Sequence, residues 1–154
     1  MPIPAHHASK SESGGFQMSA LHADDSGNAV EPVAQFDLQQ ELAECQQKKP
    51  WPSGIFSRTL FKKHDFRCVL IAMEPSAAMK EHHADGTLSV QVLKGRLRFG
   101  AEGNQFELAA GSLLTLSASI KHDVHALEDS AFLLTISWPS NEELLAMKHR
   151  GYGT

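Results

Sequence analysis

Short apolar runs separated by turn sequences dominate the chain from residue 55 to residue 138. The runs are rich in Val, Ile, Leu, Phe and Thr, which favour strands, and the gaps hold Gly, Pro, Asp, Asn or Ser, which favour turns. The eight predicted strands are residues 57–63, 66–73, 88–93, 96–100, 104–108, 112–117, 122–127 and 131–138. This pattern predicts an all-β sandwich or barrel, and a double-sheet jelly roll protects strand edges well at this size.

A short amphipathic helix is predicted ahead of the strands, over residues 37–47. Asp37 is a good N-cap, and the apolar residues behind it are spaced to share one face. Two prolines in the segment 49–54 then end the helix, because proline removes a backbone donor and biases the preceding residue away from helix. We therefore assign residues 35–54 to a short helix and a Pro-rich linker.

The two ends of the chain differ from the strand region in composition. Residues 1–34 are rich in Ser, Gly, Ala, His and Asp, so they are predicted to be a disordered acidic tail. Met18 offers a second start, which leaves the true beginning of the chain open. Residues 139–154 are predicted to form a C-terminal helix and tail, with Ser140 as its cap.

Composition and charge narrow the classes of partner. The chain has 154 residues, enough for one domain, and a net charge of −4 that arises entirely from residues 1–50. The near-neutral remainder carries no basic stripe, so nucleic acid is not an expected partner. No apolar stretch is long enough to cross a membrane and no signal peptide is evident, which predicts a cytoplasmic protein. Cys45 and Cys68 lie in unlike contexts and do not suggest a disulfide framework.

Two sets of spaced residues mark the strand region. Ser76, His82, Ala84, Leu88 and Gly95 are separated by the intervals of the first cupin motif, which reads Gly, five residues, His-X-His, three or four residues, Glu, six residues, Gly. The spacing matches the motif, although Ala84 replaces the second His and Leu88 replaces the Glu.

The second set follows at the separation expected for the second cupin motif, which reads Gly, five residues, Pro-X-Gly, two residues, His, three residues, Asn. Its positions fall on Gly111, Ser117, Ser119, His122 and Ala126. The chain therefore resembles a small single-domain cupin of the RmlC-like jelly-roll family over residues 55–138. The resemblance implies an all-β fold, a cupin-type double-stranded β-helix with short flanking helices.

In metal-binding cupins the motif histidines and the Glu hold one divalent ion inside the barrel, and only His82 and His122 keep that register here. His83 is a candidate third ligand if the strand is irregular, because adjacent side chains of a regular strand face opposite ways. If instead His83 holds the second His position, Glu81 takes the first, and Glu81, His83 and His122 form a two-histidine, one-carboxylate set suited to Fe(II). The candidate metal ligands are thus His82, His83 and His122, with Glu81 as the alternative, for iron, manganese, nickel or zinc. The competing interpretation is solvated loop histidines at 82 and 83 and a metal-free pocket histidine at 122.

Alternation of side chains along the strands predicts an apolar wall around these histidines inside the barrel. Leu88, Val90 and Val92 are expected to face inward, whereas Gln91 and His125 are expected to face outward. Leu114 and Leu116, Met73, Met79 and Phe99 are further candidates for the interior.

Three functions fit these observations. The first is a cupin that binds a small molecule through a His-ligated divalent metal, with dioxygenase-like or isomerase-like chemistry. The second is a metal-free ligand-binding, regulatory or accessory cupin without catalysis, which Leu88 at the Glu position favours. The third is a structural dimerisation unit, since the resemblance implies a homodimer. Whether the protein is an enzyme, and which ligand it takes, the sequence leaves open.

Overall fold

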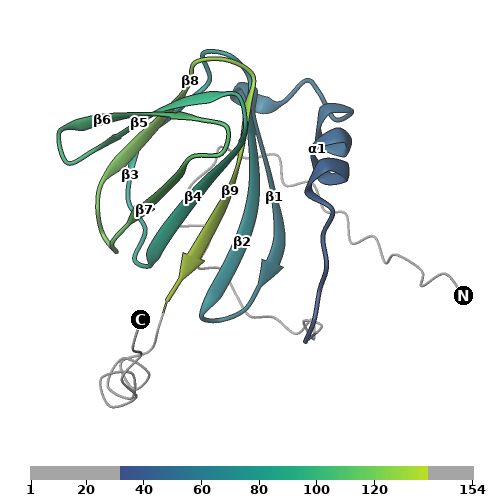
Figure 1. The fold of residues 1–154 in the computed structure, drawn as a ribbon, viewed down its shortest axis with the longest axis horizontal. Helices are drawn as coiled ribbons and strands as arrows, with labels where there is room; N and C mark the ends of the chain where they lie inside the picture. Colours follow the sequence, from purple (N-terminus) through teal and green to yellow (C-terminus); the bar gives the residue numbers. More distant parts are fainter. Residues whose placement is uncertain (1–31, 139–154) are drawn as a thin grey trace, which may run out of the picture.

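The computed structural model describes residues 32–138, which form one α-helix and nine β-strands arranged as a barrel (Figure 1). In chain order the elements are α1 (Leu38–Gln46), the 3-10 helix η2 (Pro52–Gly54), β1 (Ile55–Lys62), β2 (Phe66–Met73), β3 (Ala78–His82), β4 (Thr87–Lys94), β5 (Arg96–Ala101), β6 (Asn104–Ala109), β7 (Leu113–Leu116), β8 (His122–Ala126) and β9 (Ser130–Ser137). No helix among them is long and apolar enough to span a membrane.

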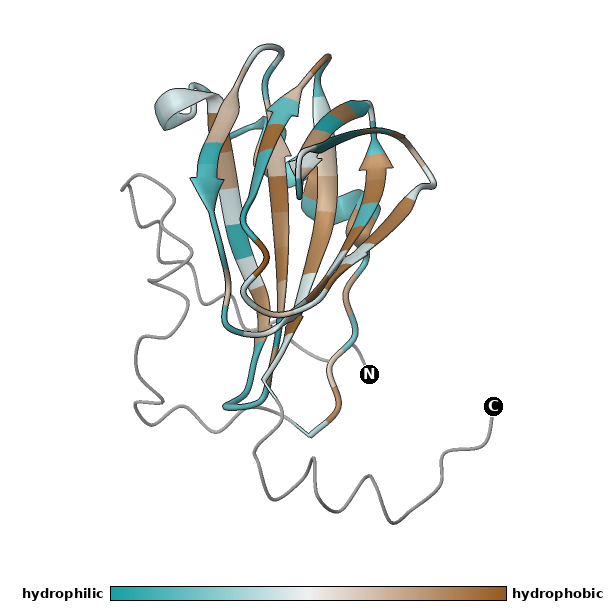
Figure 2. Ribbon diagram, turned by 90° about the vertical axis from the view of Figure 1, so that its left-hand side faces the viewer, coloured by the Kyte–Doolittle hydropathy of each residue, from teal (hydrophilic) through white to brown (hydrophobic). Residues whose placement is uncertain are grey.

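The strands form two antiparallel sheets that face each other. Sheet A has the order β1-β2-β9-β4-β7 and sheet B the order β3-β8-β5-β6. Side chains along each strand point alternately into and out of the barrel. Val69, Ile71 and Met73 of β2 therefore lie in the same core as Leu97 and Phe99 of β5. Figure 2 shows most of the hydrophobic colour on the strands. The predicted all-β jelly roll is confirmed.

Helix α1 lies beside β1 and packs against the outer face of sheet A (Figure 1). Its N-cap is Asp37, whose carboxylate accepts hydrogen bonds from the backbone amides of the first turn. Arg58 of β1 pairs with Glu41 and, at 3.0 Å, with Glu44 of the helix. These contacts agree with the helix predicted for residues 37–47.

A second cluster of buried apolar residues packs the helix against the sheet. Cys45 of α1 and Trp51 of the linker are buried against Ala72 and Ala131, small outward-facing residues of β2 and β9. The Trp51 indole donates a hydrogen bond to the carbonyl of Cys45 at 3.1 Å. Sheet A is therefore covered on its outer side where β2 and β9 run beneath the helix and linker.

The structure has one strand more than the sequence pattern predicts, namely β3. Its inward side chains, Met79 and His82, are three residues apart and enclose two polar residues, so no apolar alternation marks the segment. Residues 1–31, most of the predicted tail, and 139–154, the predicted C-terminal helix, lie outside the described residues.

Of the eight described residues with a left-handed backbone, four are of interest here: Ser76 (φ 70°), Gly95 (φ 78°), Gly111 (φ 90°) and Ser119 (φ 66°). Each occupies a glycine position of the two spaced motifs. Only glycine adopts this region without steric cost, which explains why those motif positions favour it. At Gly95, a Cβ atom would also lie only 2.3 Å from the carbonyl oxygen of Asp129.

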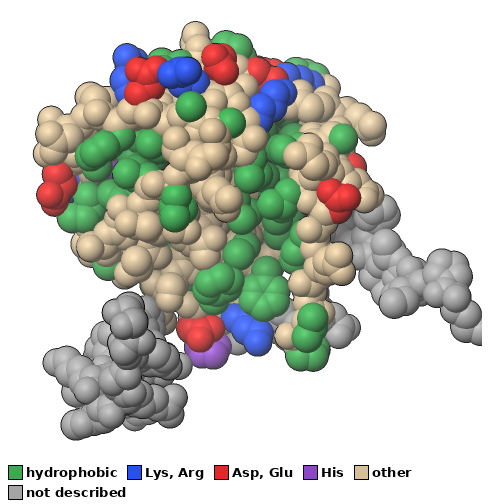
Figure 3. Space-filling model, viewed as in Figure 1, with side chains coloured by type: hydrophobic (Ala, Val, Ile, Leu, Met, Phe, Trp, Pro, Cys, Tyr) green, Lys and Arg blue, Asp and Glu red, His purple; other side chains and the backbone are tan. Residues whose placement is uncertain are grey.

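Charged side chains gather along the upper rim of the face shown in Figure 3, and hydrophobic side chains are scattered below them. Among the ion pairs of the fold, Asp129 lies 2.8 Å from Lys94 and 3.8 Å from Lys49. Exposed pairs of this kind contribute little stability, so the barrel depends on its apolar interior.

Candidate functional site: two histidines in the barrel

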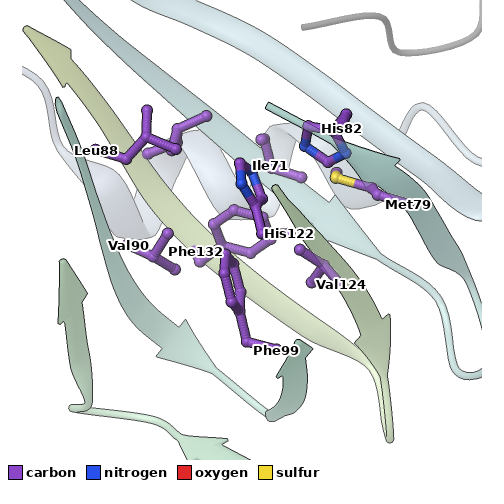
Figure 4. Close-up of a pocket in the computed structure, with 10 residues that line it drawn as sticks. Ile71, Met79, His82, Leu88, Val90, Phe99, His122, Val124 and Phe132 are labelled. Atoms are coloured by element: carbon purple, nitrogen blue, oxygen red, sulfur yellow. The ribbon is translucent and has the colours of Figure 1, made fainter. Parts of the chain in front are cut away.

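A hollow between the two sheets holds the candidate site (Figure 4). Its lining is apolar except for two imidazole rings, which project into it from sheet B. The lining residues are Ile71, Met79, His82, Leu88, Val90, Phe99, His122, Val124, Phe132 and Leu134. The free volume is about 10 Å³ for a water-sized sphere, which is close to the room that one water molecule needs.

Strand β8 places His122 at the centre of the hollow. The residue begins a strand whose inward positions are His122, Val124 and Ala126, all buried. The ring stacks on Phe99 of β5, with centroids 5.3 Å apart and planes 12° from parallel. Burial lowers the pKa of His122 below its usual value, despite an opposing hydrogen bond to the Ile120 carbonyl. The ring is therefore neutral near pH 7.

A bulge in β3 places His82 beside it. Met79 pairs with Val124 and His82 with His122, so β3 has two residues between these pairs where β8 has one. The extra residue reverses the alternation, and both Met79 and His82 face inward. The rings of His82 and His122 lie edge to face, with centroids 4.3 Å apart.

Both rings are held in the same way by the backbone. Nδ1 of His82 lies 2.6 Å from the carbonyl oxygen of Lys80, and Nδ1 of His122 lies 2.8 Å from that of Ile120. A carbonyl can only accept, so Nδ1 donates in each ring, and in the neutral form of the ring Nε2 keeps its lone pair. Metal-binding histidines are commonly oriented by such a bond. The pair thus offers two lone-pair donors to an ion, or two acceptors to a hydroxyl-bearing or amine-bearing ligand.

The structure does not bring the other two candidate ligands to this site. Glu81 is exposed, and His83 is exposed with its Nε2 3.9 Å from Oδ1 of Asp85. The predicted irregularity exists, but it falls between Met79 and His82 and turns His82 rather than His83 inward. The alternative set of Glu81, His83 and His122 is therefore not assembled.

The two motif positions without a ligand are apolar and buried. Ala84 is 9% exposed and Leu88 2% exposed, and both belong to the main core. Within residues 32–138, no three His, Cys, Asp or Glu residues are grouped closely enough to hold a metal ion. A catalytic metal site ordinarily has three protein ligands, so the residues present do not fit a resident catalytic metal.

The apolar wall follows the sequence pattern. Leu88 and Val90 line the hollow, Val92 and Leu116 are buried in the core, and Gln91 is exposed on the other face. His125 also faces away, since its β8 neighbours on both sides are the inward ones. Met79 and Phe99 line the hollow as expected, whereas Met73 is buried elsewhere in the core.

Four further lining residues are not among those predicted: Ile71, Val124, Phe132 and Leu134. Strand alternation could have found them, since each shares its inward parity with other core residues of the same strand.

Comparison with known proteins identifies the family. The family model of the AraC-like ligand binding domain matches residues 67–146, just over half of the chain. The chain belongs to the AraC-like ligand binding domain family. The match includes the strands that carry both histidines of this ligand-binding domain. A search of curated proteins gave no match.

Solved structures give the AraC-like domain a cupin fold. A conserved protein of unknown function, SPY1581 from Streptococcus pyogenes, is 20% identical with a TM-score of 0.60, covering 75% of this chain and 99% of that one. A cupin superfamily protein from Desulfitobacterium hafniense is 12% identical with a TM-score of 0.59, covering 73% and 100%. The cupin domain of an XRE family transcriptional regulator from Enterobacter cloacae is 20% identical with a TM-score of 0.51, covering 56% and 99%. The predicted cupin family is confirmed.

Proposed function

We propose that this domain binds a small molecule inside the barrel through the Nε2 atoms of His82 and His122, and that it acts as a ligand-binding or regulatory module without a resident catalytic metal. The observation that carries the proposal is the matched orientation of the two rings in an otherwise apolar hollow. Few convergent polar groups within apolar walls are typical of small-ligand sites.

The family supports a binding role. The matching model describes a ligand binding domain, and one similar structure is the cupin domain of a transcriptional regulator. Leu88 at the motif Glu position supports the absence of a resident metal, since a buried leucine stabilises the core and coordinates nothing.

The small free volume limits what enters without rearrangement. A ligand larger than water needs side chains at the hollow to change rotamer, and Met79 is suited to this because its unbranched thioether adapts its shape readily. The two imidazoles, each fixed by a backbone carbonyl, would then select among ligands by their hydrogen-bond donors.

A second candidate function is a divalent-ion site in which an ion bound by both Nε2 atoms completes its coordination with oxygen atoms of a chelating ligand. The Nδ1 hydrogen bonds favour it, because they orient both lone pairs as metal ligation requires. Iron, manganese, nickel and zinc all accept imidazole ligands.

Elemental mass spectrometry of the purified protein, joined to thermal-shift screening, separates the two. Compounds to screen are neutral sugars, polyols, amino acids and the four divalent ions. We expect no stoichiometric metal after purification, and one of the organic compounds to raise the melting temperature of the wild type but not of His82→Ala or His122→Ala.

His83→Ala and His125→Ala are the matched controls, because both histidines lie away from the hollow. They should respond as the wild type does. About one metal ion per chain, lost in both inner variants and kept in both outer ones, would instead establish the metal site. A rise in melting temperature that is the same in the wild type and in all four variants would overturn both candidate functions.

A further inference from the structure

Arg67 is a buried cation on the inner side of sheet A. Its strand β2 pairs with β9 without a register shift over the whole of its length, so strict alternation places Arg67 on the same face as Val69 and Ile71. The side chain is only 6% exposed. Arg67 thus lies near the start of β2, at one end of the barrel, with most of its surface buried.

This end of the barrel is the one that holds the histidine pair. In one cross-strand row of sheet A, Arg67 pairs with Ile136, and Ile136 pairs with Leu88, which lines the hollow. Two interstrand steps of about 4.8 Å separate the backbones of Arg67 and Leu88, a span that a long arginine side chain can bridge. At the same end, β3 finishes with His82 and β8 begins with His122.

Contacts between loops connect the segments at this end of the barrel. The backbone amide of Ser119 donates to the carbonyl of Ala84 at 2.7 Å, which joins the loops that flank His82 and His122. Gly86 lies against the residues that end β9: a Cβ there would be 3.0 Å from the Trp138 ring. The Arg67 guanidinium in turn lies 5.4 Å from the centroid of Trp138.

The charge of Arg67 has no anionic partner among the described residues. Within residues 32–138 no carboxylate lies within ion-pair distance of it, and its Nε–H is buried without a hydrogen-bond acceptor. Burial lowers the pKa of Arg67, although a guanidinium stays protonated in proteins. Buried charges are ordinarily paired, because desolvation without a compensating partner is unfavourable.

We propose that Arg67 binds the carboxylate of a small organic acid whose remainder occupies the hollow at the two histidines. The buried Nε–H has no acceptor among the described residues, and a carboxylate bound to the guanidinium would satisfy it in the bidentate pair that carboxylates favour. This inference rests on the proposed function and adds to it the chemical class of the ligand: an acid rather than a neutral compound.

The test compares acids with their uncharged amides in titrations followed by nuclear magnetic resonance. Probes are acetate and acetamide, and benzoate and benzamide, at about pH 7.5, where both acids are ionised. The readout is the Nε–H resonance of Arg67, identified by its loss in Arg67→Lys. We expect an acid to shift this resonance to saturation and the matching amide to bind at least about tenfold more weakly, since a charge-assisted pair is lost.

Arg67→Met should weaken acid binding by about tenfold or more and leave amide binding unchanged. Its melting temperature should equal or exceed that of the wild type, because an apolar side chain replaces an unpaired buried charge. A purely structural arginine would instead give a lower melting temperature. Arg98→Met, at an exposed position of β5, is the matched control and should bind acids as the wild type does.

Equal affinity for acid and amide, unchanged acid binding by Arg67→Met, or no binding of either acid would each overturn the proposal. The proposed function is judged separately by the histidine variants. If acids do not bind but the binding of neutral compounds still depends on His82 and His122, the proposed function stands without an acidic ligand. If acids bind through Arg67 but no ligand depends on the histidines, the proposed function fails and the carboxylate site remains.

Discussion

Over β2 and β9, sheet A is buried on both faces, whereas the outer face of sheet B carries exposed residues. From Val69 to Met73 every residue of β2 is at most 1% exposed, because the core covers one side and the α1 region the other. In sheet B, β5 alternates between exposed and buried residues, and four of the six residues of β6 are exposed. The centre of sheet A, formed by β2 and β9, is thus more deeply buried than β5 and β6 of sheet B.

The β2–β9 pair of sheet A and the β3–β8 pair of sheet B also differ in the regularity of their pairing. The β2–β9 pairing runs without a shift from Phe66 opposite Ser137 to Met73 opposite Ser130. The β3–β8 pairing of sheet B is broken by the bulge that turns His82 toward His122. The comparison teaches that the regular, doubly covered β2–β9 pair backs the site from one side, while the bulged β3–β8 pair supplies its imidazoles from the other.

The largest test of this comparison removes an aromatic ring from each sheet. Phe132 of β9 is 2% exposed, so Phe132→Ala should lower the free energy of unfolding by about 3–5 kcal/mol. Phe106 of β6 is 39% exposed, and Phe106→Ala should cost less than about 1 kcal/mol. Urea denaturation of both variants measures the two losses. Similar losses would mean that Phe106, at the edge of sheet B, is packed as tightly as Phe132.

A smaller effect concerns the acid stability of sheet B. Because burial lowers the folded-state pKa of His122, the unfolded chain binds more protons below the ordinary histidine pKa of 6.5. The free energy of unfolding should therefore be highest above that pH and fall as pH decreases toward the folded-state pKa. The fall should be at most about 1.4 kcal/mol for each pH unit that separates the unfolded-state pKa from the folded-state pKa.

His122→Gln isolates this contribution. Urea denaturation between about pH 8 and about pH 5 should show a shallower fall for His122→Gln than for the wild type. The nearby groups that also act on this ring are His82, His83 and Asp123, and all are retained. His125→Gln, on the outer side of the same strand, should keep the wild-type slope. Equal slopes in all three proteins would show that His122 is not responsible.

Much of sheet A follows directly from the sequence. The segment 66–73 is predicted as a strand with the bounds that β2 has, because eight mostly apolar residues lie between turn sequences. Asp37 is identifiable as the helix cap because an aspartate precedes a run of helix formers. Alternation along the strand is enough to predict that Leu88 and Val90 face inward, where both line the hollow.

The site in sheet B is harder to derive, because it depends on pairing between distant segments. Two adjacent histidines at 82 and 83 give no local reason to choose between them. The choice is made by the bulge opposite β8, where Lys80 and Glu81 together face the single residue Asp123. The volume of the hollow also depends on side chains from both sheets, which no local pattern determines.

The spacing of the two motifs predicts the backbone conformation of the turns even where the motif residues themselves are replaced. Ser76 and Ser119 stand at glycine positions of the motifs, and both have the left-handed backbone that glycine would adopt freely. The register of the motifs is therefore kept although six of their ten residues are replaced, namely Ser76, Ala84, Leu88, Ser117, Ser119 and Ala126.

The smallest predicted effect is a gain in stability at the turn before β8. Ser119 is exposed with φ of 66°, and Ser119→Gly should relieve strain of about 1–2 kcal/mol at an entropic cost of about 0.5–1 kcal/mol. The free energy of unfolding should therefore rise by up to about 1 kcal/mol in urea denaturation. Ser117→Gly is the control, since Ser117 is not among the residues with positive φ and should only lose stability from added chain entropy. A loss in both variants would show that the turn is not strained and that sheet B gains nothing from a glycine there.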